Sequence, residues 1–374
     1  MSADERPGAP SAYAQNGAGG TPAEPVRPGW WIYRGTGRPL RDIELSELLP
    51  PPPPWRAFDG GPARPAPPHD DGDLDRRLGA LENLTARQPA RGEVEAVNAA
   101  MFLRRPLLVT GKPGVGKSSL AYQITRELRL GRVLRWSISS RSTLREGLYE
   151  YDAIGRAQDA ATARQLVEAR PEAGEPPGSS IGDYVQLGPL GTALLPYRLP
   201  RVLLIDELDK SDIDLPNDLL DVFEEGEYRI PALTRVAPRE RDVEVHTADP
   251  DEKATVTKGH VRCKAFPIII ITSNGEREFP PAFMRRCIQF SMEQPDENGL
   301  ASLVAAHFTR QADAGAAQMI QDFMEYRRVH HEIAADQLLN AFFLATSGAH
   351  TQDASWKRLL DLVWQRLSPE AAPE

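Results

Sequence analysis

The stretch Gly111-Lys112-Pro113-Gly114-Val115-Gly116-Lys117-Ser118-Ser119 decides the fold of this chain of 374 residues. Two glycines bracket four residues and are followed by lysine and serine, which is the spacing of a phosphate-binding loop. The apolar run at 105–110 predicts a short buried strand before the loop, and residues 119–130 predict a helix after it. The motif therefore has the context that it requires, a strand, a glycine-rich turn and a helix.

Each part of the loop has a chemical reason to bind a nucleotide. Glycines let backbone N–H groups turn inward around a polyphosphate, and the helix that follows adds the positive end of its dipole. Lys117 can reach the β- and γ-phosphates, and the Ser118 hydroxyl can ligate Mg²⁺. We therefore predict that residues 111–119 bind a nucleoside triphosphate and that Ser118 is also a metal ligand.

A second motif lies at residues 201–207, where four apolar residues run into Asp206 and Glu207. The apolar run predicts a strand buried between two helical layers, and the acids then emerge at its carboxyl end, where ligands bind in open α/β sheets. This is the Walker B pattern. It predicts that Asp206 holds Mg²⁺ and that Glu207 is the general base that polarises the attacking water.

Residues 133–139 alternate like a second strand of the sheet, and a fourth strand, predicted at 267–273, ends in Asn274, which we expect beside the same water. Arg285 and Arg286 follow it and precede a fifth predicted strand at 287–290. The fold class is therefore α/β, with a five-stranded parallel P-loop sheet sandwiched by helices. From residue 298 onward the pattern is helical and predicts an all-α lid.

The remaining segments set the domain boundaries. We expect a Pro/Gly-rich, largely disordered arm at 1–90, a nucleotide-binding core at 91–296, a helical lid at 297–368 and a tail at 369–374. Residues 29–58 of the arm carry three of the six tryptophans. We interpret this segment as one that docks on its own ATPase, on a neighbouring subunit or on another protein. The alternative is a disordered tail with incidental aromatic residues.

Within the core, the sequence predicts a helix from Glu146 to about Val167, an exposed loop at 170–180 and a short strand at 183–187. A hairpin is expected between Asp242 and Thr257. His330 and His331 are interpreted as surface residues.

Composition excludes several classes of protein. The net charge is −9 and the isoelectric point about 5.5, which argues against a general nucleic-acid coat protein. Cys263 and Cys287 have neither disulfide-scaffold nor metal-site spacing, and we expect both to be reduced core thiols. The chain lacks a membrane span and an N-terminal signal sequence, so the expected location is the cytoplasm.

Taken together, these motifs resemble the AAA+ ATPases, and within them the MoxR-like group with an insert in the second helix. Residues 184–190, ending in Gly188-Pro189-Leu190, and the 242–257 hairpin carry the likeness to that group. The resemblance covers about residues 93–367. It implies ATP and Mg²⁺ as ligands, in preference to GTP.

The resemblance also implies roles for particular residues. It makes Asn274 the sensor 1 residue and Arg286, with Arg285 second, the arginine finger that acts on ATP held by the next subunit. Such a finger implies a homo-oligomeric ring, with six subunits as the expected number. For sensor 2, the lid offers Lys357 and Arg358, of which we prefer Arg358; both can also be ordinary solvated charges. The expected partner is a client protein or a separate protein with a von Willebrand A domain.

Three functions follow from this interpretation. The first is a ring motor that uses ATP hydrolysis to remodel or activate a partner protein. The second is an ATP-gated assembly switch that recruits effectors, which the aromatic and proline-rich arm favours. The third is a nucleic-acid translocase of the restriction type that uses GTP or ATP; the acidic segment at 170–186 disfavours it.

Overall fold

The computed structural model describes residues 28–40, 45–65, 67–70, 72–81, 89–169, 180–308, 314–330, 333–347 and 356–364. The chain divides into two units, Met1–Trp31 and Ile32–Glu374. In the described part of the first unit, the rings of Trp30 and Trp31 meet edge to face, with centroids 6.4 Å apart.

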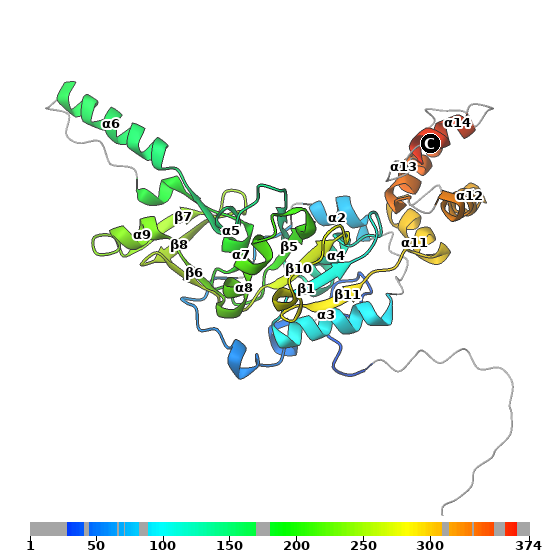
Figure 1. The fold of residues 1–374 in the computed structure, drawn as a ribbon, viewed down its shortest axis with the longest axis horizontal. Helices are drawn as coiled ribbons and strands as arrows, with labels where there is room; N and C mark the ends of the chain where they lie inside the picture. The colour runs from blue at the N-terminus through cyan, green and yellow to red at the C-terminus, as the bar shows by residue number, and fades with distance from the viewer. Residues whose placement is uncertain are drawn as a thin grey trace, which may run out of the picture. The chain divides into compact units, whose positions relative to one another are not determined.

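A five-stranded sheet forms the centre of the second unit (Figure 1). Its strands are β1 (Leu107–Thr110), β2 (Leu134–Ser137), β5 (Val202–Asp206), β10 (Ile268–Ser273) and β11 (Ile288–Ser291). The order is β11-β1-β10-β5-β2, and every pairing is parallel. The predicted fold class is confirmed, and the carboxyl ends of β1, β5 and β10 meet at one edge of the sheet.

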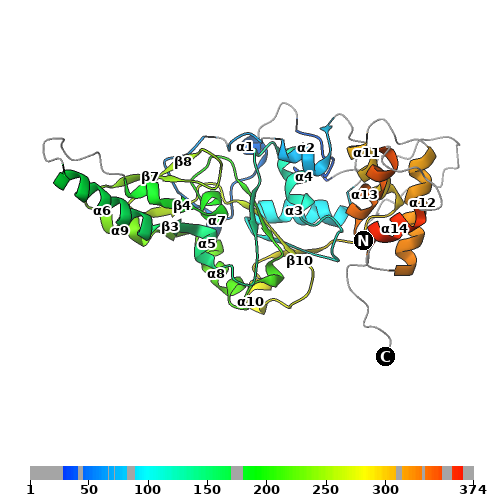
Figure 2. The same cartoon turned by 90° about the horizontal axis from the view of Figure 1, so that it is seen from above.

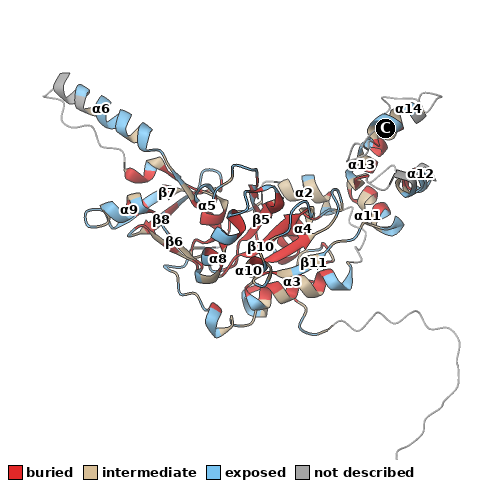
Figure 3. Cartoon of the chain, in the orientation of Figure 1, coloured by how far each residue is buried: buried red, intermediate tan, exposed pale blue. Residues whose placement is uncertain are grey.

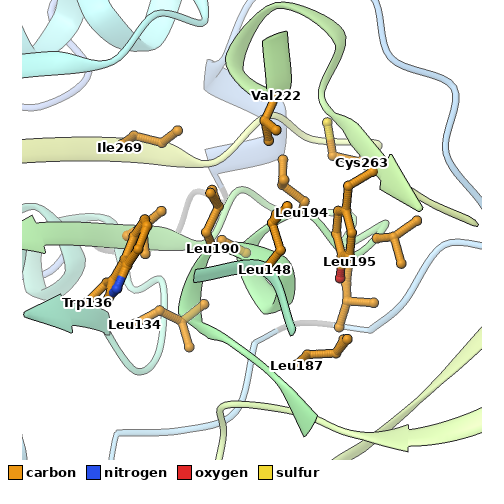
Figure 4. Close-up of a cluster of buried hydrophobic side chains, with 14 of the residues drawn as sticks. Leu134, Trp136, Leu148, Leu187, Leu190, Leu194, Leu195, Val222, Cys263 and Ile269 are labelled. Atoms are coloured by element: carbon orange, nitrogen blue, oxygen red, sulfur yellow. The ribbon is translucent and has the colours of Figure 1, made fainter. Parts of the chain in front are cut away.

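Both faces of the three inner strands β1, β10 and β5 are buried, as Figure 3 shows. Alternate residues of β5 enter different clusters: Val202 and Leu204 belong to one, Leu203 and Ile205 to the other. The first cluster is completed by helices α3 (Arg91–Leu103) and α4 (Ser119–Leu128). The second is completed by α7 (Pro189–Ala193) and α8 (Leu215–Glu225), and part of it is drawn in Figure 4. Burial on both faces explains why the inner strands β1, β5 and β10 are runs rich in Leu, Ile and Val.

A second sheet of six strands was not predicted as a unit. Its order is β3-β4-β7-β8-β9-β6. The strands are β3 (Tyr149–Tyr151), β4 (Val185–Leu187), β6 (Glu227–Arg229), β7 (Asp242–His246), β8 (Lys253–Thr257) and β9 (His260–Arg262). Strands β7 and β8 form the predicted hairpin, paired from Asp242↔Thr257 to His246↔Lys253.

The helix predicted from Glu146 to about Val167 is confirmed only from Ala153 onward, and its first part is wrong. The structure has α5 (Leu144–Leu148), then β3, then α6 (Ala153–Ala169). Thr143 and Glu146 form a capping box that starts α5, and the helix stops because Tyr149–Tyr151 pairs antiparallel with β4. Tertiary pairing overrides the local helical preference in this segment. The loop predicted at 170–180 lies outside the described residues except for Ser180.

The expectation that residues 1–90 are largely disordered does not hold for the described segments from Ile32 onward. Residues 1–27 lie outside the described residues, whereas from Ile32 onward the described segments pack on the core. Tyr33 is completely buried, and the Asn98 side chain on α3 accepts hydrogen bonds from the backbone N–H groups of Ile32 (2.8 Å) and Tyr33 (3.1 Å). Of the three expected docking surfaces, the arm therefore uses its own ATPase core. Its short helices are α1 (Leu45–Leu48), η1 (Pro54–Arg56) and α2 (Asp73–Leu78).

The lid consists of four helices that gather together in both views (Figures 1 and 2). They are α11 (Glu297–His307), α12 (Ala314–His330), α13 (Ala335–Thr346) and α14 (Trp356–Val363). Leu300, Phe323, Phe342 and Trp364 lie in their shared core. His331 and the expected tail lie outside the described residues. Among the helices that the structure describes, none is long and apolar enough to cross a membrane.

Candidate nucleotide-binding site

The glycine-rich loop turns between β1 and α4 as the motif predicts. Gly111, Gly114 and Gly116 have φ angles of 151°, 73° and 95°, which L-residues with a side chain rarely adopt. The Lys117 ammonium nitrogen lies 2.7 Å from the Gly111 carbonyl oxygen and 2.8 Å from that of Lys112. The loop thus holds the lysine by its own backbone and directs its charge across the turn.

Lys117 also joins the loop to the neighbouring strand. Its Nζ donates to Asn274 Oδ1 at 2.8 Å, so the predicted sensor 1 residue and the P-loop lysine meet although they are 157 positions apart. Burial lowers the pKa of Lys117, and the nearby Asp209, Glu207 and Asp206 carboxylates offset part of that shift. The lysine is a buried cation close to three acids at the carboxyl end of β5.

The predicted metal ligands lie together. Ser118 Oγ donates to Asp206 Oδ1 at 2.6 Å, and Thr272 Oγ1 donates to the same oxygen at 2.9 Å. A hydroxyl and a carboxylate so close are the hard oxygen donors that Mg²⁺ accepts, so the residues present fit this ion. Burial would raise the pKa of Asp206, but hydrogen bonds from Ser118, Arg135 and Thr272 outweigh it and hold that pKa below its usual range. The carboxylate is therefore charged at neutral pH.

Arg135 is a residue of the site that the sequence analysis missed. It lies on β2, and its guanidinium donates to Asp206 Oδ2 from Nη2 at 2.7 Å and from Nε at 3.2 Å. It occupies the second oxygen of the acid that is expected to hold Mg²⁺. Only the spatial pairing of β2 with β5, which places Arg135 opposite Leu204, brings it there.

Glu207 has a strained backbone and an accessible carboxylate. Its φ of 63° places a non-glycine residue in the left-handed region, a conformation that clusters at functional sites. The strain is held by the Glu207 N–H, which donates to Thr272 Oγ1 at 2.8 Å. The carboxylate is 42% exposed and lies 2.8 Å from Lys210 Nζ, so it can reach a water at the open side of the sheet edge.

Asp209 was also missed. It is buried, and its Oδ2 accepts the backbone N–H groups of Asn274 at 2.8 Å and of Glu276 at 3.2 Å. It lies in η5 (Leu208–Lys210), directly after the Walker B strand. Asp209 therefore fixes the turn after β10 that carries Asn274. The sequence signal for it is the third acid of the run Asp206-Glu207-Leu208-Asp209.

The predicted arginine pair follows α10 (Pro281–Met284). Arg286 is half-buried, and its Nε donates to Glu224 Oε1 at 2.8 Å. Arg285 is exposed, and its backbone carbonyl accepts from Arg105. Among the described contacts, none joins either guanidinium to residues 111–119 of the same chain.

Among the described contacts, none joins Arg358 to the loop. Arg358 lies exposed on α14, and the Lys357 side chain is outside what the structure describes. The start of α13 touches the loop instead: the Ala335 N–H lies 3.3 Å from the Gly114 carbonyl oxygen, and a Cβ on Gly114 would come within 2.2 Å of Ala334 Cβ.

One lid arginine pair does share a cavity with the loop. A cavity of about 680 Å³ is lined by Lys112 of the loop and by residues of α12 that include Arg327 and Arg328. The sequence analysis did not single out these two arginines, which line the same cavity as Lys112 of the loop.

Comparison with known proteins agrees with this geometry. Residues 106–287 match the family model described as AAA domain (dynein-related subfamily). No curated protein matches the chain. A solved structure titled "Structure of C. elegans PCH-2" is similar at 12% identity, over 78% of this chain and 71% of that chain, with a TM-score of 0.38.

The segment that holds Lys117, Asp206, Glu207 and Asn274 is therefore the one that matches the AAA domain model. Domains of this class are in general nucleotide-hydrolysing ATPases that bind their nucleotide with Mg²⁺. The match does not extend to the MoxR-like group, and that assignment stays a prediction.

Proposed function

We propose that this protein is an ATPase that hydrolyses ATP to ADP and phosphate in a homo-oligomeric ring and uses the cycle to remodel or activate a partner protein. One observation carries the proposal. Two hydrogen bonds join three strand ends: Lys117 of the loop after β1 donates to Asn274 after β10, and Ser118 of the same loop donates to Asp206 at the end of β5, which Glu207 follows. A chain that only bound nucleotide as a scaffold would have no need of a general base at this position.

In this proposal each residue has one task. Lys117 and the N–H groups of the loop bind the phosphates, and Ser118 and Asp206 hold Mg²⁺, which supplies positive charge to the phosphate oxygens when it is bound. Glu207 accepts a proton from the attacking water, and Asn274 orients that water.

The arginine finger is the one part of the proposed site that has to come from a neighbouring subunit. We propose that Arg286, or Arg285 after it, acts on the nucleotide of the next subunit, because neither has a described contact with its own loop. This requires a ring, for which we propose six subunits. The preference for ATP over GTP, the cytoplasmic location and a partner with a von Willebrand A domain rest on the resemblance to MoxR-like proteins.

An assembly switch is the second candidate, and the docked arm favours it. The Glu127 carboxylate, on the helix that follows the P-loop, accepts hydrogen bonds from Thr36 and Gly37 of the arm. A change in α4 on nucleotide binding would be passed to the arm, which could then recruit an effector. The two candidates differ in whether turnover, or only nucleotide binding, is needed for the effect on the partner.

The test is Glu207→Gln, with Lys117→Ala as the matched control. We expect Glu207→Gln to keep ATP bound with Mg²⁺ and to lose hydrolysis by roughly 10²- to 10⁴-fold, the usual contribution of a positioned base. Lys117→Ala should lose nucleotide binding itself, measured with a fluorescent ATP analogue. If Glu207→Gln turned ATP over at the normal rate, or bound no ATP, the role proposed for this residue would be refuted.

A further inference from the structure

The arm places one buried cation at the carboxyl end of α8. Arg56, in η1, is 3% exposed although it is an arginine. Its Nη1 donates to the Phe223 carbonyl and, at 3.3 Å, to the Glu224 carbonyl, so it satisfies oxygens that the end of a helix leaves free. Its Nη2 also lies 3.3 Å from Glu224 Oε2.

The same carboxylate holds the proposed arginine finger. Glu224 Oε1 accepts from Arg286 Nε at 2.8 Å, while Glu224 Oε2 pairs with Arg56. Each carboxylate oxygen is therefore assigned to one guanidinium. Without Arg56, the Glu224 side chain, which is 38% exposed, would be free to rotate, and Arg286 would lose a fixed partner.

Other contacts fix this part of the arm firmly. The Phe58 ring stacks on Phe266 with centroids 5.4 Å apart and planes 22° apart. Phe58 lies over Gly226, where an added Cβ would approach its ring within 2.7 Å, and Gly226 has a φ of 64°. Gly60 N–H donates to the Cys263 carbonyl at 3.0 Å. A segment so fixed can act as a rigid support.

We propose that residues 54–58 of the arm position the arginine finger: Arg56 holds Glu224, and Glu224 holds Arg286 in the orientation that serves the neighbouring subunit. Arg56 and Glu224 are thus positioning residues for a site in another protomer. The inference rests on the proposed function, since it takes Arg286 as the finger acting in trans. It gives the arm a role in catalysis, where the sequence showed only aromatic residues and prolines.

The proposal predicts an unusual kinetic signature. Arg56→Ala should lower kcat roughly 10- to 100-fold, the scale of a misplaced catalytic group, and leave the affinity for ATP unchanged because the protomer's own loop is intact. Arg56→Lys, which keeps the charge near Glu224, should recover part of kcat. Asp59→Ala is the matched control, because it removes an exposed ion pair of the same segment, with Arg262, that does not involve Glu224.

The deciding experiment mixes protomers. Glu207→Gln protomers cannot hydrolyse ATP but carry an intact finger, so mixing them with Arg286→Ala protomers should restore activity if the finger acts in trans. Mixing them with Arg56→Ala protomers should restore activity in the same way.

The outcomes separate the two claims. If the Arg286→Ala mixture recovers activity and the Arg56→Ala mixture does not, Arg56 acts within its own protomer and the inference is wrong. Arg56→Ala with a normal or raised kcat would overturn it too, the raised kcat showing that Glu224 restrains the finger. If the Arg286→Ala mixture shows no recovery, the trans finger of the proposed function fails, and this inference fails with it.

Discussion

Glu127→Ala is the substitution that tests how the arm is attached to the core. The Glu127 side chain, on α4, is 1% exposed. Its Oε2 accepts from Thr36 N (2.7 Å), Thr36 Oγ1 (3.0 Å) and Gly37 N (3.2 Å), and its Oε1 accepts from Arg34 N. One carboxylate on the core thus collects four donors from the 34–37 loop.

The magnitude follows from these contacts. Four hydrogen bonds to a charged acceptor, at about 1.5–3 kcal/mol each, set an upper bound of about 6–12 kcal/mol. Burial raises the pKa of Glu127 despite these bonds, because desolvation of the ionised carboxylate outweighs them, so the net effect lies well below that bound. The donors also lie in a partly exposed loop and regain water when it loosens. We therefore expect Glu127→Ala to lower the free energy of unfolding by about 3 kcal/mol.

The assay is urea denaturation followed together with trypsin cleavage after Arg34; Arg38 precedes Pro39 and is not cleaved. We expect an earlier unfolding midpoint and faster cleavage of the arm under native conditions. Glu95→Ala is the control, because it removes an exposed pair with Arg91 on α3 and should change stability by less than about 0.5 kcal/mol. If Glu127→Ala behaved like this control, the arm would not be held by the carboxylate.

Three further predictions concern single contacts. Arg135→Ala removes the guanidinium that we expect to compete with Mg²⁺ for the Asp206 carboxylate. The Mg²⁺ concentration for half-maximal nucleotide binding should therefore fall, by about three- to tenfold because the pair is partly exposed. An unchanged Mg²⁺ concentration would show that Arg135 does not compete with Mg²⁺. Burial raises the pKa of Cys263 and of Cys287 to about 12, so both thiols stay protonated at pH 8. In the native protein they should react with a thiol reagent far more slowly than in the protein unfolded in urea. Rapid labelling of the native protein would contradict their burial. Asp249→Ala removes the ion-pair partner of the fully buried Arg201 and should lower the free energy of unfolding, measured in urea, by about 3–5 kcal/mol. A loss below about 1 kcal/mol would show that Arg201 finds water or another partner.

The central sheet could be predicted because its information is local. The three inner strands β1, β10 and β5 are short runs rich in Leu, Ile and Val, and chemistry-bearing residues follow at their carboxyl ends, as Asp206 follows Ile205. The second sheet could not be assembled in the same way. Its strand Tyr149–Tyr151 is three residues long and pairs with a segment 34 or more positions away, so no local pattern shows it.

The site divides in the same manner. Lys117, Ser118 and Asp206 are named by motifs, whereas Arg135, Asp209 and the Glu224–Arg286 pair depend on which strands and helices become neighbours. The arm shows the limit most clearly, because its anchors, Glu127 and Asn98, lie on core helices and give no signal within residues 1–90. The high proline and glycine content of residues 1–90 is typical of a linker, and this is why the sequence predicted disorder there.

The central claim is that one protomer binds ATP and the next supplies the arginine that completes the site. The most direct measurement is specific ATPase activity across a wide range of protein concentration, with oligomer size followed by sedimentation in the same samples. The account predicts that activity per protomer rises steeply as rings assemble and then levels off, and that Arg286→Ala assembles without this rise. Activity per protomer that stays constant from the monomer to the assembled state would contradict it.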